Sequence, residues 1–201
     1  MKFLFMVSVG LISMTVNAKT VVVLGDSISA GYGIDVNAGW VSLLEKKLNE
    51  NGAHHVVHNE SISGDTTAGG LARLNHALDF KPNIFILELG ANDGLRGFQP
   101  SLIKNNLTQI IQRAQQTGAK VVLLSMKIPP NYGDRYITLF YDMYPQLAKE
   151  LNTAYVPFIM EDVALTKEMM QADGLHPNEK GQPAIMNKVL TEVLPLLKCV
   201  H

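Results

Sequence analysis

Apolar and polar positions fall into short blocks of two kinds along this chain. Five apolar runs rich in β-branched residues predict buried strands, and they are Thr20–Leu24, His55–Asn59, Ile84–Leu89, Lys120–Ser125 and Ala154–Phe158. Five longer amphipathic stretches predict helices at Trp40–Glu50, Thr66–Leu78, Ser101–Thr117, Ile137–Leu151 and Glu179–Leu197. Because strands and helices alternate, we expect a three-layer α/β/α sandwich with a five-stranded parallel sheet and helical crossovers.

Local signals support several of these helix ends. Asp65 or Thr66 can cap the helix that follows it, and Gly118 ends the next one. Pro183 falls in the first turns of the last helix, where a missing N–H costs least. The signals at the helix ends therefore agree with the helices that the amphipathic stretches predict.

The first eighteen residues have the pattern of a secretory signal peptide. Lys2 gives a positive start, residues 3–16 are almost all apolar, and Val16-Asn17-Ala18 places small residues at a cleavage site. The alternative, a membrane anchor, needs a longer apolar run of about 20 residues and different flanks. We therefore expect residues 1–18 to be removed, residues 19–201 to form a single domain, and the mature protein to be periplasmic.

Composition narrows the class of protein further. The chain has 201 residues, of which 47% are hydrophobic and 17% charged, and its formal net charge is −1. These values are ordinary for one soluble domain and favour neither nucleic-acid binding nor an anionic membrane surface. Cys199 is the single cysteine, so no intramolecular disulfide can form. We expect a monomer with a free terminal thiol, an intermolecular disulfide being the alternative.

Candidate chemistry begins where the first predicted strand ends. Val21-Val22-Val23-Leu24-Gly25-Asp26-Ser27 is an apolar run that stops at a glycine and leaves a serine at the turn. In open α/β sheets the carboxyl ends of the strands border the ligand crevice. Serine is a poor nucleophile by itself, so a catalytic Ser27 requires a base and an oxyanion site elsewhere. Asp173 and His176, three positions apart in a late loop, are candidates for an acid and a base.

Two further glycine-bearing turns follow the second and third predicted strands, Ser63-Gly64-Asp65 and Gly90-Ala91-Asn92-Asp93. Together the four blocks resemble the SGNH-hydrolase (GDSL-type esterase) family. The resemblance covers nearly all of the chain after Ala18 and implies a flavodoxin-like strand order. One departure is Ile28, where the family has leucine, and we expect this aliphatic exchange to have little consequence.

The resemblance implies a serine hydrolase that cleaves esters and thioesters through an acyl-enzyme. Ser27 would be the nucleophile, His176 the general base and Asp173 the acid that orients it. The oxyanion would accept hydrogen bonds from the backbone N–H groups of Ser27 and Gly64 and from the side-chain amide of Asn92. The resemblance implies no metal or cofactor in this mechanism.

Two loops resemble a narrower group of the family, namely periplasmic enzymes of Gram-negative bacteria that act on acyl-CoA thioesters, lysophospholipids and aryl esters. The first is Gly94-Leu95-Arg96-Gly97-Phe98-Gln99-Pro100, and the second is Pro130-Asn131-Tyr132-Gly133. Apolar residues in and beside these loops are candidates for an acyl groove, and they are Leu95, Phe98, Met126, Ile128, Pro129, Pro130 and Tyr132. Each of them could instead only pack a loop onto the sheet.

Three other interpretations remain open at this stage. His54, His55 and His58 could bind a metal, although they flank a predicted strand and we expect solvated histidines at a strand edge. A carbohydrate O-acetyl or short-chain esterase could use the same scaffold, since fold does not fix substrate. A flavodoxin-like binding domain without activity is the non-enzymatic alternative. The chain has no glycine-rich phosphate loop followed by lysine, so a nucleotide cofactor is unsupported.

Overall fold

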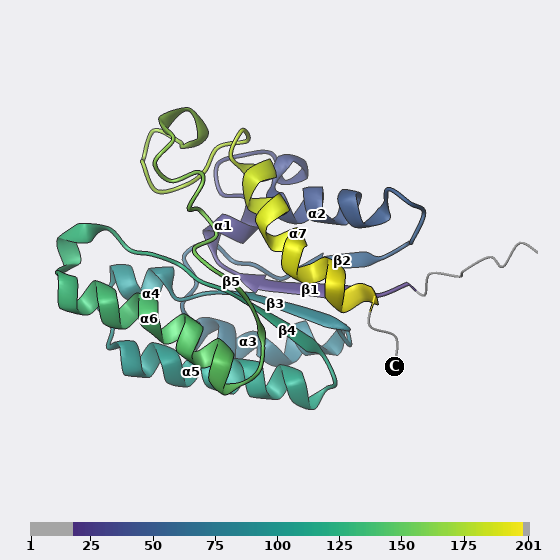
Figure 1. Ribbon diagram of the computed structural model, residues 1–201, viewed down its shortest axis with the longest axis horizontal. Helices are drawn as coiled ribbons and strands as arrows, with labels where there is room; N and C mark the ends of the chain where they lie inside the picture. Colours follow the sequence, from purple (N-terminus) through teal and green to yellow (C-terminus); the bar gives the residue numbers. More distant parts are fainter. Residues whose placement is uncertain (1–17, 199–201) are drawn as a thin grey trace, which may run out of the picture.

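The computed structural model describes residues 18–198, which form a five-stranded parallel sheet with helices on both faces (Figure 1). The strands are β1 (Thr20–Gly25), β2 (Val56–Asn59), β3 (Ile84–Glu88), β4 (Lys120–Leu124) and β5 (Ala154–Val156). Their order across the sheet is β2-β1-β3-β4-β5, and every neighbouring pair is parallel. This order is flavodoxin-like, so the predicted architecture is confirmed. The expected signal peptide, apart from Ala18, and Cys199 lie outside the described residues.

Two groups of helices cover the sheet. On one face α2 (Trp40–Asn49) packs beside α7 (Gln182–Lys198), and on the other α5 (Pro100–Gln116) packs between α3 (Thr67–Asp79) and α6 (Asp134–Glu150) (Figure 1). All five predicted helices are present. Within residues 18–198, no helix combines the length and apolar character needed to cross a bilayer.

Two helix starts differ from the prediction by three residues. The chain turns into α6 at Gly133, whose φ of 86° favours glycine, so the helix begins earlier than expected. The start of α7 is later than expected because residues 178–181 form a turn of their own. The Asn178 side chain accepts from the Lys180 N–H at 2.9 Å, and the Gly181 N–H donates to the Asn178 carbonyl at 3.1 Å.

Short elements fill the connections after the strands. Two helices of a single turn, α1 (Ser27–Ala30) and α4 (Ala91–Leu95), follow β1 and β3. Three 3₁₀ turns lie at Val36–Ala38, Pro130–Tyr132 and Lys167–Met169. None of them was predicted, because an amphipathic period needs more than one turn to be visible in a sequence.

The centre of the sheet fixes where the loops meet. Residues 21–24 of β1 and 84–87 of β3 are at most 1% exposed, and they pair in register from Val21 with Ile84 to Gly25 with Glu88. The carboxyl ends of these strands are therefore side by side, with the end of β2 next to β1. The loops that carry Ser27, Gly64 and Asn92 consequently emerge at one edge of the sheet.

Candidate active site

Ser27 is the first residue of α1, and only Asp26 separates it from the end of β1. The Asp26 carboxylate caps this short helix by accepting the Ile28 N–H at 3.1 Å. Gly25 leaves no room for a side chain, because a Cβ there would lie 2.7 Å from Ser29 Cβ and 2.8 Å from Glu88 Oε2. The structure therefore explains both residues before Ser27: Gly25 by the lack of room for a side chain, and Asp26 by its cap on α1.

The serine hydroxyl meets the late loop that the sequence alone could not dock. His176 Nε2 lies 2.9 Å from Ser27 Oγ, and His176 Nδ1 lies 2.7 Å from Asp173 Oδ2. The other Asp173 oxygen accepts the backbone N–H groups of Leu175 at 2.9 Å and His176 at 3.0 Å. The bond to His176, together with these backbone donors, lowers the pKa of Asp173 to about 2. The carboxylate therefore stays ionised and fixes the imidazole orientation.

Contacts within the late loop and with the loop after β1 hold this pair in place. The Gln171 N–H donates to the His176 carbonyl at 2.8 Å, and Met170 forms an antiparallel bridge with Pro177. The Gln171 side chain donates to the Tyr32 carbonyl at 2.7 Å, while the Tyr32 and His176 rings lie 4.7 Å apart. Sequence reasoning missed Gln171 and Tyr32, since their contacts join segments far apart in the chain.

The three candidate oxyanion donors lie on the loops after β1, β2 and β3. Gly64 has a φ of 81°, a left-handed value that explains the glycine. Within residues 18–198, the backbone N–H groups of Ser27 and Gly64 donate to no other protein group. The Asn92 amide donates to Asp26 Oδ2 at 3.1 Å and to the Asp65 carbonyl at 2.9 Å. The amide thus joins the loops after β1 and β2 from its place on α4.

A buried acid lies beneath the serine turn. Glu88, at the end of β3, is fully buried and accepts from the Ser29 hydroxyl at 2.7 Å and the Asp26 N–H at 3.2 Å. Burial, together with the nearby Asp26 charge, raises the pKa of Glu88 well above its usual range. Burial also raises the pKa of Asp26, to about 6. The turn that carries the proposed nucleophile therefore lies on two carboxyl groups whose pKa values are both raised.

Asp93, the acid next to Asn92, supports the start of α3. Its two oxygens accept the Thr67 N–H at 2.9 Å and the Thr67 hydroxyl at 2.6 Å. Asn106 of α5 adds a bond to the same hydroxyl at 3.0 Å. Asp93 therefore ties α4 to α3.

A cavity of about 210 Å³ contains Ser27, Asn92 and His176. Its apolar lining comes from several segments, namely Ile28, Ala91, Leu95, Met126, Pro129, Met160 and Leu175. Three of the candidate groove residues, Leu95, Met126 and Pro129, are thus at the serine.

The other groove candidates lie elsewhere. Ile128 is buried against Gly94, and the Tyr132 hydroxyl points to the Leu95 carbonyl at 2.7 Å. Phe98 is 38% exposed and Pro130 is exposed, and neither lines the serine cavity. A separate hollow of about 460 Å³ includes Tyr132 but not Ser27. We therefore leave these four residues out of the groove at the serine.

The histidines in and before β2 were expected to be solvated, but one of them is buried. His55 precedes the strand, is 7% exposed, and accepts the Lys19 N–H at Nδ1 over 3.0 Å. Its burial lowers its pKa. The expectation of a solvated histidine was wrong at this position. The His58 ring stacks on Phe80 at 4.0 Å, and within residues 18–198 no three potential metal ligands converge.

Comparison with known proteins decides the family. The model of the GDSL-like lipase/acylhydrolase family matches residues 23–184. The chain belongs to this family. It is 49% identical to Esterase TesA of Pseudomonas aeruginosa, over 90% of both proteins. It is 44% identical to Thioesterase 1/protease 1/lysophospholipase L1 of Escherichia coli strain K12, over 90% of this chain and 86% of that protein.

Structural comparison agrees with this membership of the GDSL-like family. A crystal structure of the psychrotrophic esterase EstA from Pseudoalteromonas sp., described as inhibited by monoethylphosphonate, has a TM-score of 0.85. It shares 39% identity and covers 90% of this chain and all of its own. The family resemblance drawn from the four sequence blocks is confirmed, and the chain is a hydrolase of the ester- and thioester-cleaving kind.

Proposed function

We propose that this protein hydrolyses carboxylic esters and thioesters through an acyl-enzyme on Ser27. The observation that carries the proposal is the hydrogen-bonded series from Ser27 Oγ to His176 Nε2 and from His176 Nδ1 to Asp173 Oδ2. A nucleophile within reach of a base that a third group orients is the arrangement that acyl transfer needs. Membership of a family of lipases and acylhydrolases supports the same reaction class.

In the first half of the proposed reaction, Ser27 Oγ attacks the acyl carbonyl carbon while His176 Nε2 takes the hydroxyl proton. His176 then gives that proton to the leaving alcohol or thiol as the bond to it breaks. In the second half, His176 takes a proton from water as its oxygen attacks the acyl carbon, and then gives the proton to Ser27 Oγ as the bond between Oγ and the acyl group breaks and the carboxylic acid leaves. Asp173 keeps Nδ1 protonated and stabilises the imidazolium throughout.

The oxyanion formed in each half would accept hydrogen bonds from the N–H groups of Ser27 and Gly64 and from Asn92 Nδ2. Both Asn92 amide hydrogens already have acceptors, at 2.9 and 3.1 Å. The oxyanion would compete for the longer bond, which goes to Asp26. An alkoxide-like oxyanion carries its charge on one oxygen and is a stronger acceptor than a carboxylate, which spreads its charge over two. The exchange therefore favours the transition state over the bound substrate.

For the substrate we propose a medium or long acyl chain, with acyl-CoA thioesters, lysophospholipids and aryl esters as candidates. The apolar side chains of Leu95, Met126 and Pro129 beside Ser27 support this choice. So does the identity shared with a protein named as thioesterase and lysophospholipase. A preference for acetylated sugars would instead need polar groups around the serine, and the lining is mainly apolar.

We further propose that the protein acts as a periplasmic monomer after removal of residues 1–18. Lys2, the apolar run at residues 3–16 and the small residues before Lys19 support the signal peptide. Secretion can be checked by the N-terminal sequence of the protein recovered from the periplasm, and the monomer by its mass in solution.

Labelling with a fluorophosphonate tests the proposed function directly. The reagent should attach to Ser27 in the parent protein and not in Ser27→Ala, and hydrolysis of a p-nitrophenyl ester should be lost in the same variant. The matched control is Ser42→Ala, which removes an exposed hydroxyl that donates only to the Val36 carbonyl. Labelling and ester hydrolysis by the parent protein should both be unchanged in EDTA. Labelling of Ser27→Ala, or activity that EDTA abolishes and zinc restores, would overturn the proposal.

A further inference from the structure

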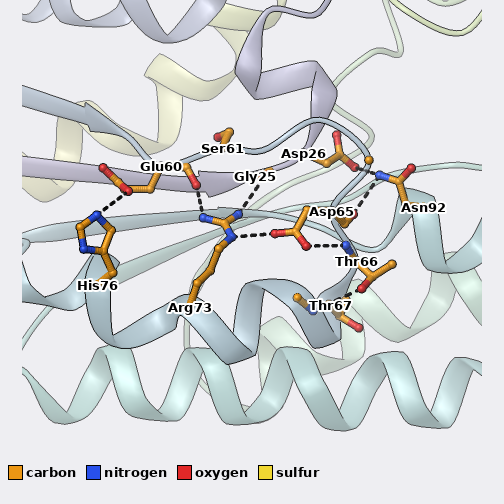
Figure 2. A network of polar contacts seen from close by, with 12 residues as sticks. Gly25, Asp26, Glu60, Ser61, Asp65, Thr66, Thr67, Arg73, His76 and Asn92 are labelled. Atoms are coloured by element: carbon orange, nitrogen blue, oxygen red, sulfur yellow. Dashed lines mark hydrogen bonds and ion pairs between the residues drawn. The ribbon is translucent and has the colours of Figure 1, made fainter.

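The Arg73 guanidinium contacts three segments that meet below the proposed oxyanion site. Arg73 lies on α3, and its side chain is 21% exposed. Nε donates to Asp65 Oδ2 at 2.7 Å, Nη2 donates to the Gly25 carbonyl at 3.3 Å, and Nη1 donates to the Glu60 carbonyl. Figure 2 shows the guanidinium in the middle of these acceptors. One planar group thus joins the end of β1 to both halves of the loop between β2 and α3.

Two of these segments, at Gly25 and Asp65, lead directly to candidate oxyanion donors. Gly25 is two residues before Ser27, and Asp65 follows Gly64. The Asp65 carbonyl accepts the Asn92 amide at 2.9 Å, as Figure 2 also shows. The donors from the loops after β1, β2 and β3 are therefore linked to the same guanidinium through at most two residues each.

We propose that Arg73 is the positioning residue of the oxyanion site, holding the loops after β1 and β2 so that the three donors keep a fixed spacing. The inference rests on the proposed function, because it concerns the same oxyanion. Arg73 acts through Gly25 and Asp65 and makes no contact of its own with the acyl group.

The chemistry of arginine suits this role. A guanidinium has five N–H donors in a rigid plane, whereas a lysine ammonium is a single charged centre on a flexible stem. A lysine at position 73 would keep its attraction to Asp65, whose side chain is 12% exposed, but could not reach three acceptors in three directions. Oxyanion stabilisation depends on donors aimed before charge develops, so a small displacement of these loops should reduce the rate of the chemical step.

The test compares steady-state kinetics of Arg73→Gln and Arg73→Lys with the parent protein. We expect kcat to fall about 10- to 100-fold in both variants, with KM within about twofold. The matched control is His76→Ala on the same helix, which removes a contact of 3.4 Å to the Glu60 side chain but no bond to Gly25 or Asp65. This variant should keep the kcat of the parent.

A double-mutant cycle separates positioning from general stability. If Arg73 acts on the oxyanion donors, Arg73→Gln should cost a clearly smaller factor in kcat when Asn92 is already alanine. Equal losses in both backgrounds would overturn the proposal, and so would a normal kcat in Arg73→Lys. Arg73→Lys retains the charge opposite Asp65, so the test survives if Arg73→Gln does not fold. Ser27→Ala in the same assay distinguishes the two proposals. If Ser27→Ala remains active, the proposed function is contradicted. If Ser27→Ala is inactive and the Arg73 variants keep the kcat of the parent, only the role of Arg73 is contradicted.

Discussion

Asn92 donates its side-chain amide to the Asp26 carboxylate over 3.1 Å, which links α4 to the residue directly before the proposed nucleophile. The same amide donates to the Asp65 carbonyl. Asn92 therefore has both a structural part, as a bridge between three loops, and a proposed chemical part, as an oxyanion donor. The two parts predict different kinetic consequences when the amide is removed.

Asn92→Ala should lower kcat by roughly 10²–10³ with little change in KM, because an oxyanion bond strengthens as charge develops in the transition state. Kinetics and melting temperature measured on the one variant test this. A destabilised protein with near-normal kcat would restrict Asn92 to its structural part.

Ser27→Ala and His176→Ala should each abolish esterase activity, and the double variant should be no worse than either single one. Residues that act as one unit show this non-additivity. Asp173→Asn should be impaired less, because the His176 ring loses its orientation but keeps its contact with Ser27. Initial rates of the four variants on one p-nitrophenyl ester suffice. Full activity of a folded Ser27→Ala protein would remove the nucleophile assignment.

The free energy of unfolding should depend on pH through Glu88 and Asp26. Both acids have a raised pKa in the folded state, to about 6 for Asp26. The folded protein therefore binds more protons than the unfolded chain above the ordinary carboxyl pKa. Their contribution to stability is present below that pKa and is lost as pH rises through the folded-state values.

Glu88→Gln mimics the protonated acid and should reduce this loss. Relative to the parent, the variant should therefore gain unfolding free energy as the pH rises from 4 to 8. Urea unfolding at several pH values measures the difference. Glu161→Gln is the control, because Glu161 is exposed and its pKa is lowered by the ion pair with Lys188. A constant difference between parent and Glu88→Gln would show that Glu88 does not titrate in this range.

Tyr136→Phe should weaken the segment that carries Leu95. The Tyr136 hydroxyl of α6 donates to the Phe98 carbonyl at 2.6 Å, and removing one such bond costs about 0.5–1.5 kcal/mol. Since Leu95 lines the cavity at Ser27, we expect KM for a long-chain ester to rise several-fold while an acetyl ester is hydrolysed as before. Tyr155→Phe is the control, because its hydroxyl donates to Ser125, just after β4, and not to the segment that carries Leu95. An equal change for both substrates would contradict a role of this loop in acyl binding.

The rate per active site should rise with acyl length up to a medium or long chain. Each methylene transferred from water is worth about 0.8 kcal/mol, or roughly fourfold in kcat/KM while the apolar wall continues. A series of p-nitrophenyl esters from acetyl to palmitoyl, extended to acyl-CoA, lysophospholipid and acetylated sugars, measures this. A flat profile, or a preference for acetyl groups, would favour the short-chain or carbohydrate esterase.

The sheet and its layers could be predicted because their signal is local. Runs such as residues 21–24 are apolar at every position, as both faces of a parallel strand are covered. The one-turn helices α1 and α4 could not be predicted, since four or five residues show no period. His55 was placed wrongly because its burial depends on the Lys19 N–H, a contact across 36 positions.

The candidate site was predictable as far as the chemistry fixes the residue type. Ser27, Asn92, Asp173 and His176 carry groups that acyl transfer requires, and their blocks resemble a known family. Arg73 is different, because its partners are mostly backbone carbonyls that any sequence supplies. Glu88 is the one charged residue within the apolar run Ile84–Leu89, and this isolated charge could have indicated a buried acid.

The hydrogen bond between Ser27 and His176 joins residues 149 positions apart. The amino-terminal part of the chain holds the proposed nucleophile and all three oxyanion donors, whereas the base and its acid come shortly before α7. The Trp40 N–H of α2 donates to Gln182 at the start of α7, so this last helix docks against the first long one. A chain cut before residue 173 would lack both the proposed base and the helix that packs on α2. The proposed Ser27–His176 pair can therefore form only once the loop before α7 has packed against the end of β1.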